Sequence, residues 1–273
     1  MGRKDFEVYK VAGDLLKFIT SSGVRTKMMI GLLQEPQSSG QMRDAIGVSA
    51  STVIHAARDL EKENLLVEKD NGYQLTAIGR IIADKLFDTL HTIGVLNQHR
   101  DFWLTHNVMS IPQPFLERIG EIQEYDIVTS SVKDIFKTFG IYMDFATKAR
   151  EFWGVSPVFV EAFVSLIQKL LKRDANVRLV ITEEVMAELI NTDRAGLKQS
   201  LSNSNLGMLV IDGPVKVAFT VTESMLSLGL FGMDGVYDVS HDLVSKHQGA
   251  INWGRELFEY YRSQARPLAV EDI

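Results

Sequence analysis

The sequence predicts a mixed α+β protein in two parts, a helical module closed by a β-hairpin and then an α/β domain with a mixed sheet. Three observations predict this fold. Capped stretches with helical apolar spacing run through residues 24–63, and an Asn-Gly pair near position 71 separates two short apolar segments. Beyond position 114, apolar runs of strand length first alternate with helical patterns and then follow one another directly.

The first part begins with three short helices. The first helix is expected to stop near Pro36, since proline cannot occupy a helix interior. The second is expected over about 39–46, and Gly47 then makes a tight turn because glycine adopts positive φ without steric cost. Ser49 is the expected N-cap of the third helix, which covers about residues 50–63.

The third helix and the segment after it indicate a nucleic-acid reader. The helix has an apolar stripe on one side and polar residues on the other. Strand candidates at 65–69 and 73–75 then flank Asp70-Asn71-Gly72, and Asn-Gly is the strongest short-range signal of a hairpin. Three helices followed by a hairpin are the pattern of a winged helix-turn-helix domain, whose third helix reads base edges in the major groove.

We expect two kinds of DNA contact. Polar residues near the start of the third helix should contact bases, and basic residues around the groove should contact phosphates. The candidate DNA-binding residues are Ser49, Ser51, Thr52, His55, Arg58, Arg25, Lys27, Arg43, Lys69 and Asn71. Phosphate contacts have no motif signature, so each basic residue fits an ordinary solvated surface charge equally well.

The charge distribution supports DNA binding only in part. Residues 1–97 carry equal numbers of basic and acidic side chains, which is a weaker footprint than the basic patch typical of DNA-binding domains. Residues 98–273 therefore carry the whole net charge of −6 and do not form a nucleic-acid surface. A second class of function stays open, in which the winged helix is a protein-interaction module that acts on the transcription machinery without specific DNA binding.

Composition excludes several other classes. With 273 residues, 45% of them hydrophobic and 23% charged, the chain has an ordinary globular composition and room for two domains. No apolar run approaches the roughly 18 residues of a membrane span, and the first residues lack a signal-peptide core, so we expect a cytoplasmic protein without a membrane partner. The absence of cysteine excludes disulfides, thiolate metal sites and thiol catalysis.

We expect three segments. Residues 1–97 form the winged helix-turn-helix domain with flanking helices, residues 98–113 form a linker marked by prolines, and residues 114–273 form an α/β regulatory domain for ligand sensing or dimerisation. A long helical pattern from Thr76 to about Leu96 is suited to be the stem of a homodimer, which would place two reading helices one duplex turn apart. The alternative is a helix that packs only across its own two domains.

The second part has strand and helix signals in mixed order. The expected strands are 125–129, 177–181, 208–211, 215–221 and 225–231, and the expected helices are 157–171, one around 185–190, and 249–262. Small-molecule pockets are mostly apolar with a few polar groups. The candidate residues for binding a small-molecule effector are Trp153, Phe159, Phe219, Ser227, Phe231 and Tyr237, although each aromatic ring also fits a plain core position.

No catalytic or metal-binding constellation is predicted, and no cofactor is expected. The chain has no glycine-rich phosphate loop, no Gly-x-Ser-x-Gly elbow and no His-Glu-x-x-His motif. His241 and Lys246 lack the spacing of a phospholipase-like nuclease. The histidines at 91, 99 and 106, with Asp101 nearby, lack the i, i+4 regularity of a helical metal site. We therefore expect a protein that is not an enzyme.

Three blocks of the second part carry a family resemblance: VRLVITEEV, VAFTVTESMLSLGLFGMDGVYDVSHDLVS and AINWGRELFEYYR. In this order they resemble the second half of archaeal winged-helix transcription regulators, the methanogenesis-regulatory-protein domain, over about residues 114–263. The resemblance implies a cytoplasmic archaeal regulator of one-carbon or methanogenic genes, and it implies no particular ligand residues. Together with the residues above, it predicts a DNA-binding regulator that is dimeric and responds to a ligand.

Overall fold

The computed structural model describes residues 3–273, so the first two residues of the expected first domain lie outside the described part. The chain divides into two compact units, Met1–Leu90 and His91–Ile273. The division falls within a long helix that carries the chain from one unit into the other. Each unit has hydrophobic core residues of its own.

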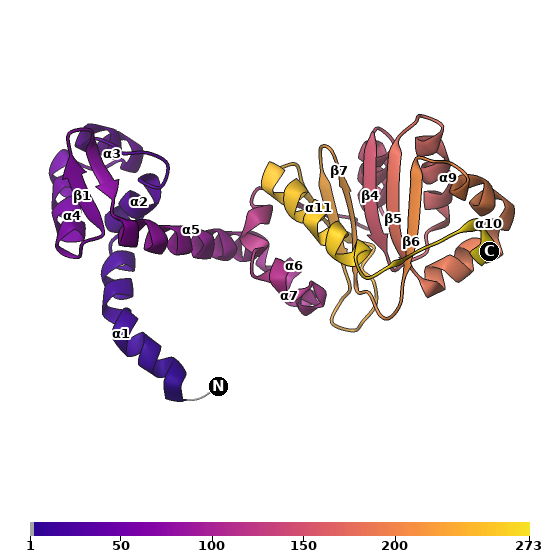
Figure 1. Cartoon of the computed structure of the whole chain (residues 1–273), viewed down its shortest axis with the longest axis horizontal. Coiled ribbons are helices and arrows are strands. Elements are labelled where there is room, and N and C mark those ends of the chain that lie inside the picture. The colour runs from indigo at the N-terminus through magenta and orange to yellow at the C-terminus, as the bar shows by residue number, and fades with distance from the viewer. Residues whose placement is uncertain (1–2) are drawn as a thin grey trace. The chain divides into compact units, whose positions relative to one another are not determined.

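The first unit contains helices around one small core, followed by a two-stranded hairpin (Figure 1). The helices that form its core are held by local caps. Ser38 and Gln41 form a capping box at the second of the expected helices, and Gly47 ends that helix with a φ of 78°. The elements are α1 (Arg3–Thr20), α2 (Gly23–Gly31), α3 (Ser39–Ile46), α4 (Ala50–Lys62), β1 (Leu66–Lys69), β2 (Gly72–Leu75) and α5 (Ala77–Gln98).

These elements follow the predicted winged-helix pattern closely. Strands β1 and β2 pair antiparallel, with Lys69 opposite Gly72 at the tip. One boundary differs, because α2 ends at Gly31 before the expected stop near Pro36, and glycine is a weak helix former. The apolar sides of α2, α3 and α4 meet in a core that includes Met28, Met42 and Leu60, each at most 1% exposed.

The second unit is built on an eight-stranded mixed sheet in the order β10-β6-β5-β4-β7-β8-β9-β3. Strands β4, β5 and β6 are parallel, and the other pairings are antiparallel. The predicted fold class, α+β with a mixed sheet, is confirmed. The strands are β3 (Asp126–Thr129), β4 (Glu151–Ser156), β5 (Asn176–Thr182), β6 (Leu206–Ile211), β7 (Val217–Thr222), β8 (Leu226–Leu230), β9 (His241–Ser245) and β10 (Arg266–Pro267).

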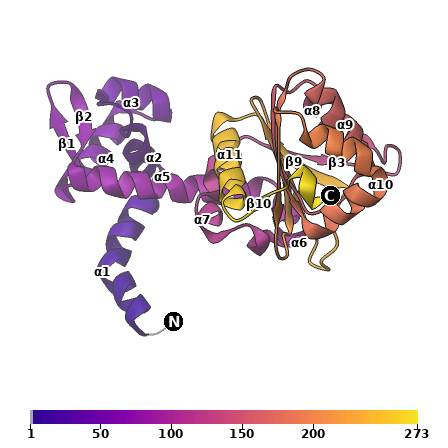
Figure 2. The same cartoon turned by 45° about the vertical axis from the view of Figure 1, so that its right-hand side comes forward.

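Helices cover both faces of this sheet, and α11 lies on the face opposite α8, α9 and α10 (Figure 2). Trp253 and Phe258 of α11 are fully buried against the sheet. On the other face, Leu166 and Leu170 of α9 enter a second core. The helices are α6 (Arg100–Thr105), α7 (Gln113–Leu116), α8 (Lys137–Ala146), α9 (Glu161–Leu171), α10 (Glu183–Leu201) and α11 (Gln248–Arg262), with 3-10 turns η1 (Val108–Ser110), η2 (Ile119–Ile122) and η3 (Val270–Asp272).

The structure differs from the expected linker at 98–113. Phe102, Trp103 and Ile111 of this segment are buried in the core of the second unit. The indole Nε1 of Trp103 donates to the hydroxyl of Tyr125 at 2.8 Å and to the carbonyl of Val95 at 3.1 Å. These large apolar side chains pack rather than face water, because each buried side chain of this size contributes on the order of 2 kcal/mol.

Several elements of the second unit were not predicted from the sequence. Strand β4 was not predicted, and the expected helix at 157–171 begins only at Glu161, after Pro157 and the residues that follow β4. Helix α8 has weak helical periodicity, and β9 contains a histidine and an aspartate inside a buried strand. Among the residues that the structure describes, no helix is long and apolar enough to cross a membrane.

Candidate DNA-reading and ligand-binding sites

Helix α4 presents the predicted polar face to solvent. Val53, Ala57 and Leu60 are completely buried, whereas His55 and Arg58 are exposed on the other side. Burial of the apolar stripe fixes the rotation of the helix, so the sequence pattern itself decides which residues face outward. The structure thus brings the predicted base-reading residues onto one exposed surface.

The start of α4 carries a cluster of three hydroxyl groups. The Oγ of Ser49 accepts from the backbone N–H of Thr52 at 3.2 Å and lies 2.9 Å from the Oγ of Ser51 and 2.8 Å from the Oγ1 of Thr52. All three residues are exposed. This arrangement caps the helix and leaves hydroxyl donors and acceptors at the end that enters a groove in helix-turn-helix proteins.

Arg25 differs from the other candidate phosphate contacts. Its Nε donates to the carbonyl of Phe18 at 2.8 Å, its guanidinium lies 4.1 Å from the centre of the Phe18 ring, and its Nη1 lies 3.6 Å from Asp59. The side chain is only 18% exposed. Arg25 therefore joins α1, α2 and α4, and we do not carry it forward as a phosphate contact.

The remaining basic candidates lie at the surface. Lys27, Arg58 and Lys69 are exposed, as is Asn71 in the turn of the hairpin. Arg43 is also exposed, but its guanidinium forms an ion pair of 2.7 Å with the neighbouring Asp44. Exposed ion pairs of this kind are weak, about 0–1 kcal/mol, so a phosphate can compete for Arg43.

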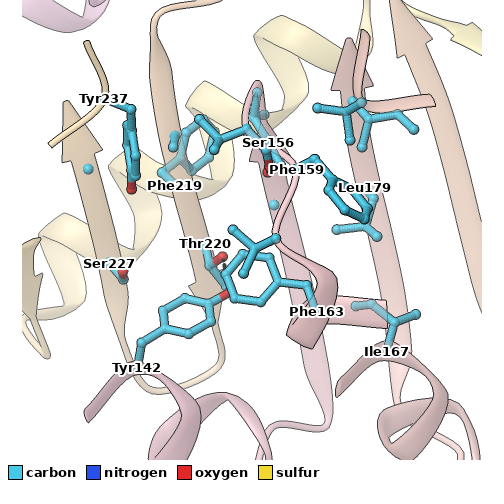
Figure 3. Close-up of a pocket in the computed structure, with 18 of the residues that line it drawn as sticks. Tyr142, Ser156, Phe159, Phe163, Ile167, Leu179, Phe219, Thr220, Ser227 and Tyr237 are labelled. Carbon is cyan, nitrogen blue, oxygen red and sulfur yellow. Dashed lines mark hydrogen bonds between the residues drawn. The ribbon is translucent and has the colours of Figure 1, made fainter. Parts of the chain in front are cut away.

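The second unit contains a cavity of about 270 Å³ between the sheet and the helices α8, α9 and α10. Its wall is mostly apolar. Figure 3 shows Phe163 and Ile167 from α9 facing the strands that carry Leu179 and Thr220. A largely apolar hollow of this kind is typical of a site for a small molecule.

Polar groups gather in one part of this cavity. The Oγ of Ser227 donates to the Oδ2 of Asp242 at 2.6 Å, and the hydroxyls of Tyr142 and Thr220 lie 2.9 Å apart (Figure 3). Burial raises the pKa of Asp242 to about 7, against the opposing effect of the Ser227 hydrogen bond. Burial also raises the pKa of the Tyr237 hydroxyl above its usual value. The cavity thus combines an apolar wall with a carboxyl group that is poised to donate or accept a hydrogen bond.

Four of the six residues predicted to bind an effector line this cavity: Phe159, Phe219, Ser227 and Tyr237. Phe219 borders the cavity from β7, but its ring packs against Tyr261 of α11, with ring centroids 6.2 Å apart, and belongs to the core on the α11 face. Trp153 and Phe231 do not line the cavity.

Side-chain alternation along a strand explains the position of Trp153. Its neighbours Phe152 and Gly154 in β4 line the cavity, so Trp153 points to the opposite face of the sheet. There its ring lies 5.4 Å from that of Phe258 and within 5.4 Å of the guanidinium groups of Arg178 and Arg255. Phe231 instead packs edge-on against Tyr237 at 5.4 Å. We carry neither residue forward as a ligand contact.

Sequence reasoning missed several residues of the cavity. Tyr142 comes from the unpredicted helix α8, and Asp242 comes from the unpredicted strand β9. One signal was available for Asp242, because a carboxylate within a strand is rarely buried without a partner or a function.

Comparisons with known proteins agree with this architecture. The family model of the N-terminal domain of methanogenesis regulatory protein FilR1 matches residues 13–94, and the family model of the middle domain of the same protein matches residues 135–264. Methanogenesis regulatory protein FilR1 of Methanothrix harundinacea (strain 6Ac) is 27% identical over 262 residues, which cover 94% of this chain and 59% of that relative. The chain therefore spans less than two thirds of the length of this relative.

Two solved structures illustrate the fold neighbours. TrmBL2, described as an archaeal chromatin protein, has a TM-score of 0.44 and 14% identity, and covers 93% of this chain and 98% of its own. Nuc, a phospholipase D family member from Salmonella typhimurium, has a TM-score of 0.39 and 15% identity, and covers 54% of this chain and 99% of its own. We draw nothing about function from either likeness.

A helix-turn-helix with a hairpin wing, followed by an α/β unit with a cavity, defines a winged-helix protein with a separate second unit. The chain belongs to the family of archaeal winged helix-turn-helix transcription regulators that carry a methanogenesis-regulatory-protein type domain, as the two FilR1 family models and the predicted blocks agree. The relative that matches both units is named as a regulatory protein.

Proposed function

We propose that the protein binds double-stranded DNA as a homodimer and that a small apolar effector in the second unit controls this binding. The observation that carries the proposal is the exposed face of α4, with its capped N-terminus and the polar residues Ser51, Thr52 and His55. Helices of this kind present their N-terminal residues to base edges in the major groove. The similarity to methanogenesis regulatory protein FilR1 supports genes of methanogenic metabolism as targets.

DNA binding is tested by fluorescence anisotropy of promoter duplexes from such genes, titrated with salt. If Lys69 neutralises one phosphate, Lys69→Ala makes the negative slope of log affinity against log salt shallower by about 0.9. Lys62→Ala is the matched control, since this exposed lysine lies in the last turn of α4, away from the N-terminal end that we expect to enter the groove. Salt-independent binding, or none, would favour the alternative of a protein-interaction module.

Dimerisation is supported by apolar side chains that face solvent on two helices. Phe6 and Leu16 of α1 are 76% and 52% exposed, and Ile78, Ile81 and Ile93 of α5 are 60%, 65% and 56% exposed. The helical spacing places the three isoleucines on one broad side of α5. A second copy of the chain is the occupant we propose, because a reading helix on each of two protomers matches paired half-sites in the duplex.

Effector control is supported by the cavity. Its apolar wall suits a hydrocarbon body, and the polar groups around Asp242 suit a single polar end. Mass spectrometry of small molecules released from the denatured purified protein tests this. Val164→Phe narrows the cavity from α9 and should abolish retention, whereas equal retention by both proteins would place the molecule elsewhere.

A further inference from the structure

Three potential metal ligands meet beside the cavity, and one of them, His106, lies far from the other two in the sequence. The Nε2 of His106 lies 3.1 Å from the Oδ2 of Asp238, and the Nδ1 of His241 lies 2.7 Å from the same oxygen. The three ligand atoms all lie within 4.8 Å of one another. Of the histidines at 91, 99 and 106, only His106 belongs to this group in the described part of the chain, and its partners come from the β8–β9 connection and β9.

The surroundings of His106 indicate a cation. The side chain is 4% exposed, and its Nδ1 lies 2.8 Å from the carbonyl of Phe102. A neutral imidazole that donates its N–H from Nδ1 has a lone pair at Nε2. In His106 that lone pair would face the carboxylate oxygen of Asp238, so two hydrogen-bond acceptors would meet with no proton between them. Either a proton or a metal ion resolves this conflict. A ring N–H donated to a backbone carbonyl is also the usual outer support of a metal-bound histidine.

The backbone holds the ligands in place before any ion binds. His106 forms a β-bridge with Gly232, and the backbone N–H of Asn107 donates to the carbonyl of Phe231 at 2.8 Å. The second oxygen of Asp238 accepts from the hydroxyl of Ser240 at 2.6 Å, which orients the carboxylate. These contacts leave free the ring nitrogens and the carboxylate oxygen that would bind the metal, so they can hold the site before an ion arrives.

We propose that His106, Asp238 and His241 bind one divalent transition-metal ion of the zinc class. Two imidazoles and one carboxylate suit zinc, which binds nitrogen and oxygen at about 2.0–2.2 Å and takes three protein ligands plus one exchangeable ligand. A tetrahedral ion needs ligand atoms about 3.3 Å apart. The Asp238 oxygen would therefore move away from the His106 nitrogen by about 0.2 Å and from the His241 nitrogen by about 0.6 Å. Asp238 and His241 also line the cavity, which places the ion at its edge.

The test uses the full chain after treatment with a chelator. We expect zinc in isothermal titration calorimetry to bind at one equivalent per chain, and cobalt(II) to give the intense visible bands of tetrahedral coordination. His241→Ala and Asp238→Asn should each weaken zinc binding by about 100-fold or more, the upper end of the loss caused by removing an outer-shell partner. Circular dichroism shows whether each variant folds, and the 36% exposed side chain of His241 makes its removal tolerable.

His247→Asn is the matched control. It removes a histidine that does not belong to the cluster and retains a side-chain acceptor for the Gly249 N–H at the start of α11, so zinc binding should be unchanged. Octahedral cobalt spectra, or equal zinc affinity in the wild type and His241→Ala, would overturn the proposal. The cluster would then be a protonated histidine paired with Asp238.

Discussion

Asp242 is a carboxyl group inside a sheet of apolar strands, and it makes the stability of the second unit depend on pH. The residue is 8% exposed, and burial raises its pKa to about 7, above the ordinary value of 3.8. Tyr142 and Tyr237 face it, and burial raises the pKa of both hydroxyls, so they stay neutral at physiological pH. Asp238 keeps its charge, because hydrogen bonds from Ser240 and His241 outweigh partial burial and lower its pKa to about 2.

The direction of the pH effect follows from the raised pKa. The folded state binds a proton at Asp242 more tightly than the unfolded state, so this stabilisation is complete below about pH 3.8 and is lost as the pH rises through about 7. Between pH 5 and 8 the loss amounts to about 2–3 kcal/mol. Asp242→Asn cannot titrate and should flatten this part of the profile. Urea unfolding of both proteins at several pH values, with a chelator present, measures the difference, and parallel profiles would contradict the assignment.

Arg25 and Lys27 are neighbours in α2 with different predicted roles. Arg25→Ala should lower the free energy of unfolding by about 1–3 kcal/mol, since it removes a hydrogen bond to Phe18 and a cation–π contact with the same residue. Lys27→Ala should change stability by no more than about 0.5 kcal/mol and should weaken DNA binding instead. Thermal unfolding together with anisotropy separates the two effects. If Arg25→Ala kept its stability and its DNA affinity depended less on salt, Arg25 would be a phosphate contact after all.

At the scale of the element, helix α5 contains two glycines with opposite requirements. A Cβ at Gly79 would lie 1.8 Å from the carbonyl oxygen of Leu65, so the start of α5 packs directly on the backbone that follows α4. Gly94 is exposed, and a Cβ there would meet no atom of the described residues within 4 Å. Gly79 is needed for the close approach of α5 to the Leu65 backbone, whereas Gly94 only lowers the stability of the helix.

Alanine at these positions should therefore have opposite effects. Gly79→Ala should destabilise the first unit by about 3 kcal/mol or more, because backbone atoms cannot move aside easily. Gly94→Ala should stabilise the helix by about 0.5–1 kcal/mol. Chemical denaturation of both variants is the measurement. A harmless Gly79→Ala would mean that α5 does not dock against the Leu65 carbonyl.

At the scale of the whole molecule, the proposed dimer links self-association to DNA binding. Leu16→Glu places a charge on the exposed apolar side of α1, and we expect it to shift sedimentation from dimer to monomer. Affinity for a duplex with two half-sites should then fall at least about 10-fold, since two linked contacts become independent. Lys10→Glu, on the same helix, is the control for charge alone. Unchanged sedimentation of Leu16→Glu would remove α1 from the interface.

The sequence by itself determined the winged-helix unit. The capping residues Ser38 and Ser49, the turn at Gly47 and the hairpin at Asn71-Gly72 all act within a few residues of their own position. Such signals survive in the sequence because their energy depends on local backbone geometry. The fold class of the second unit and its family followed in the same way from apolar runs and recognisable blocks.

Only the tertiary structure decided where the cavity and the proposed metal site lie. The hydrogen bond between His106 and Asp238 spans 132 positions, and Asp242 becomes buried through the pairing of β9 with β3 and β8. The helices that cover the sheet likewise decide whether the side chain of Trp153 in β4 points to the cavity or to α11. These outcomes arise from contacts between distant segments. A strand buried on both faces has the same local apolar pattern whichever face lines the cavity, so the sequence pattern does not distinguish the two faces.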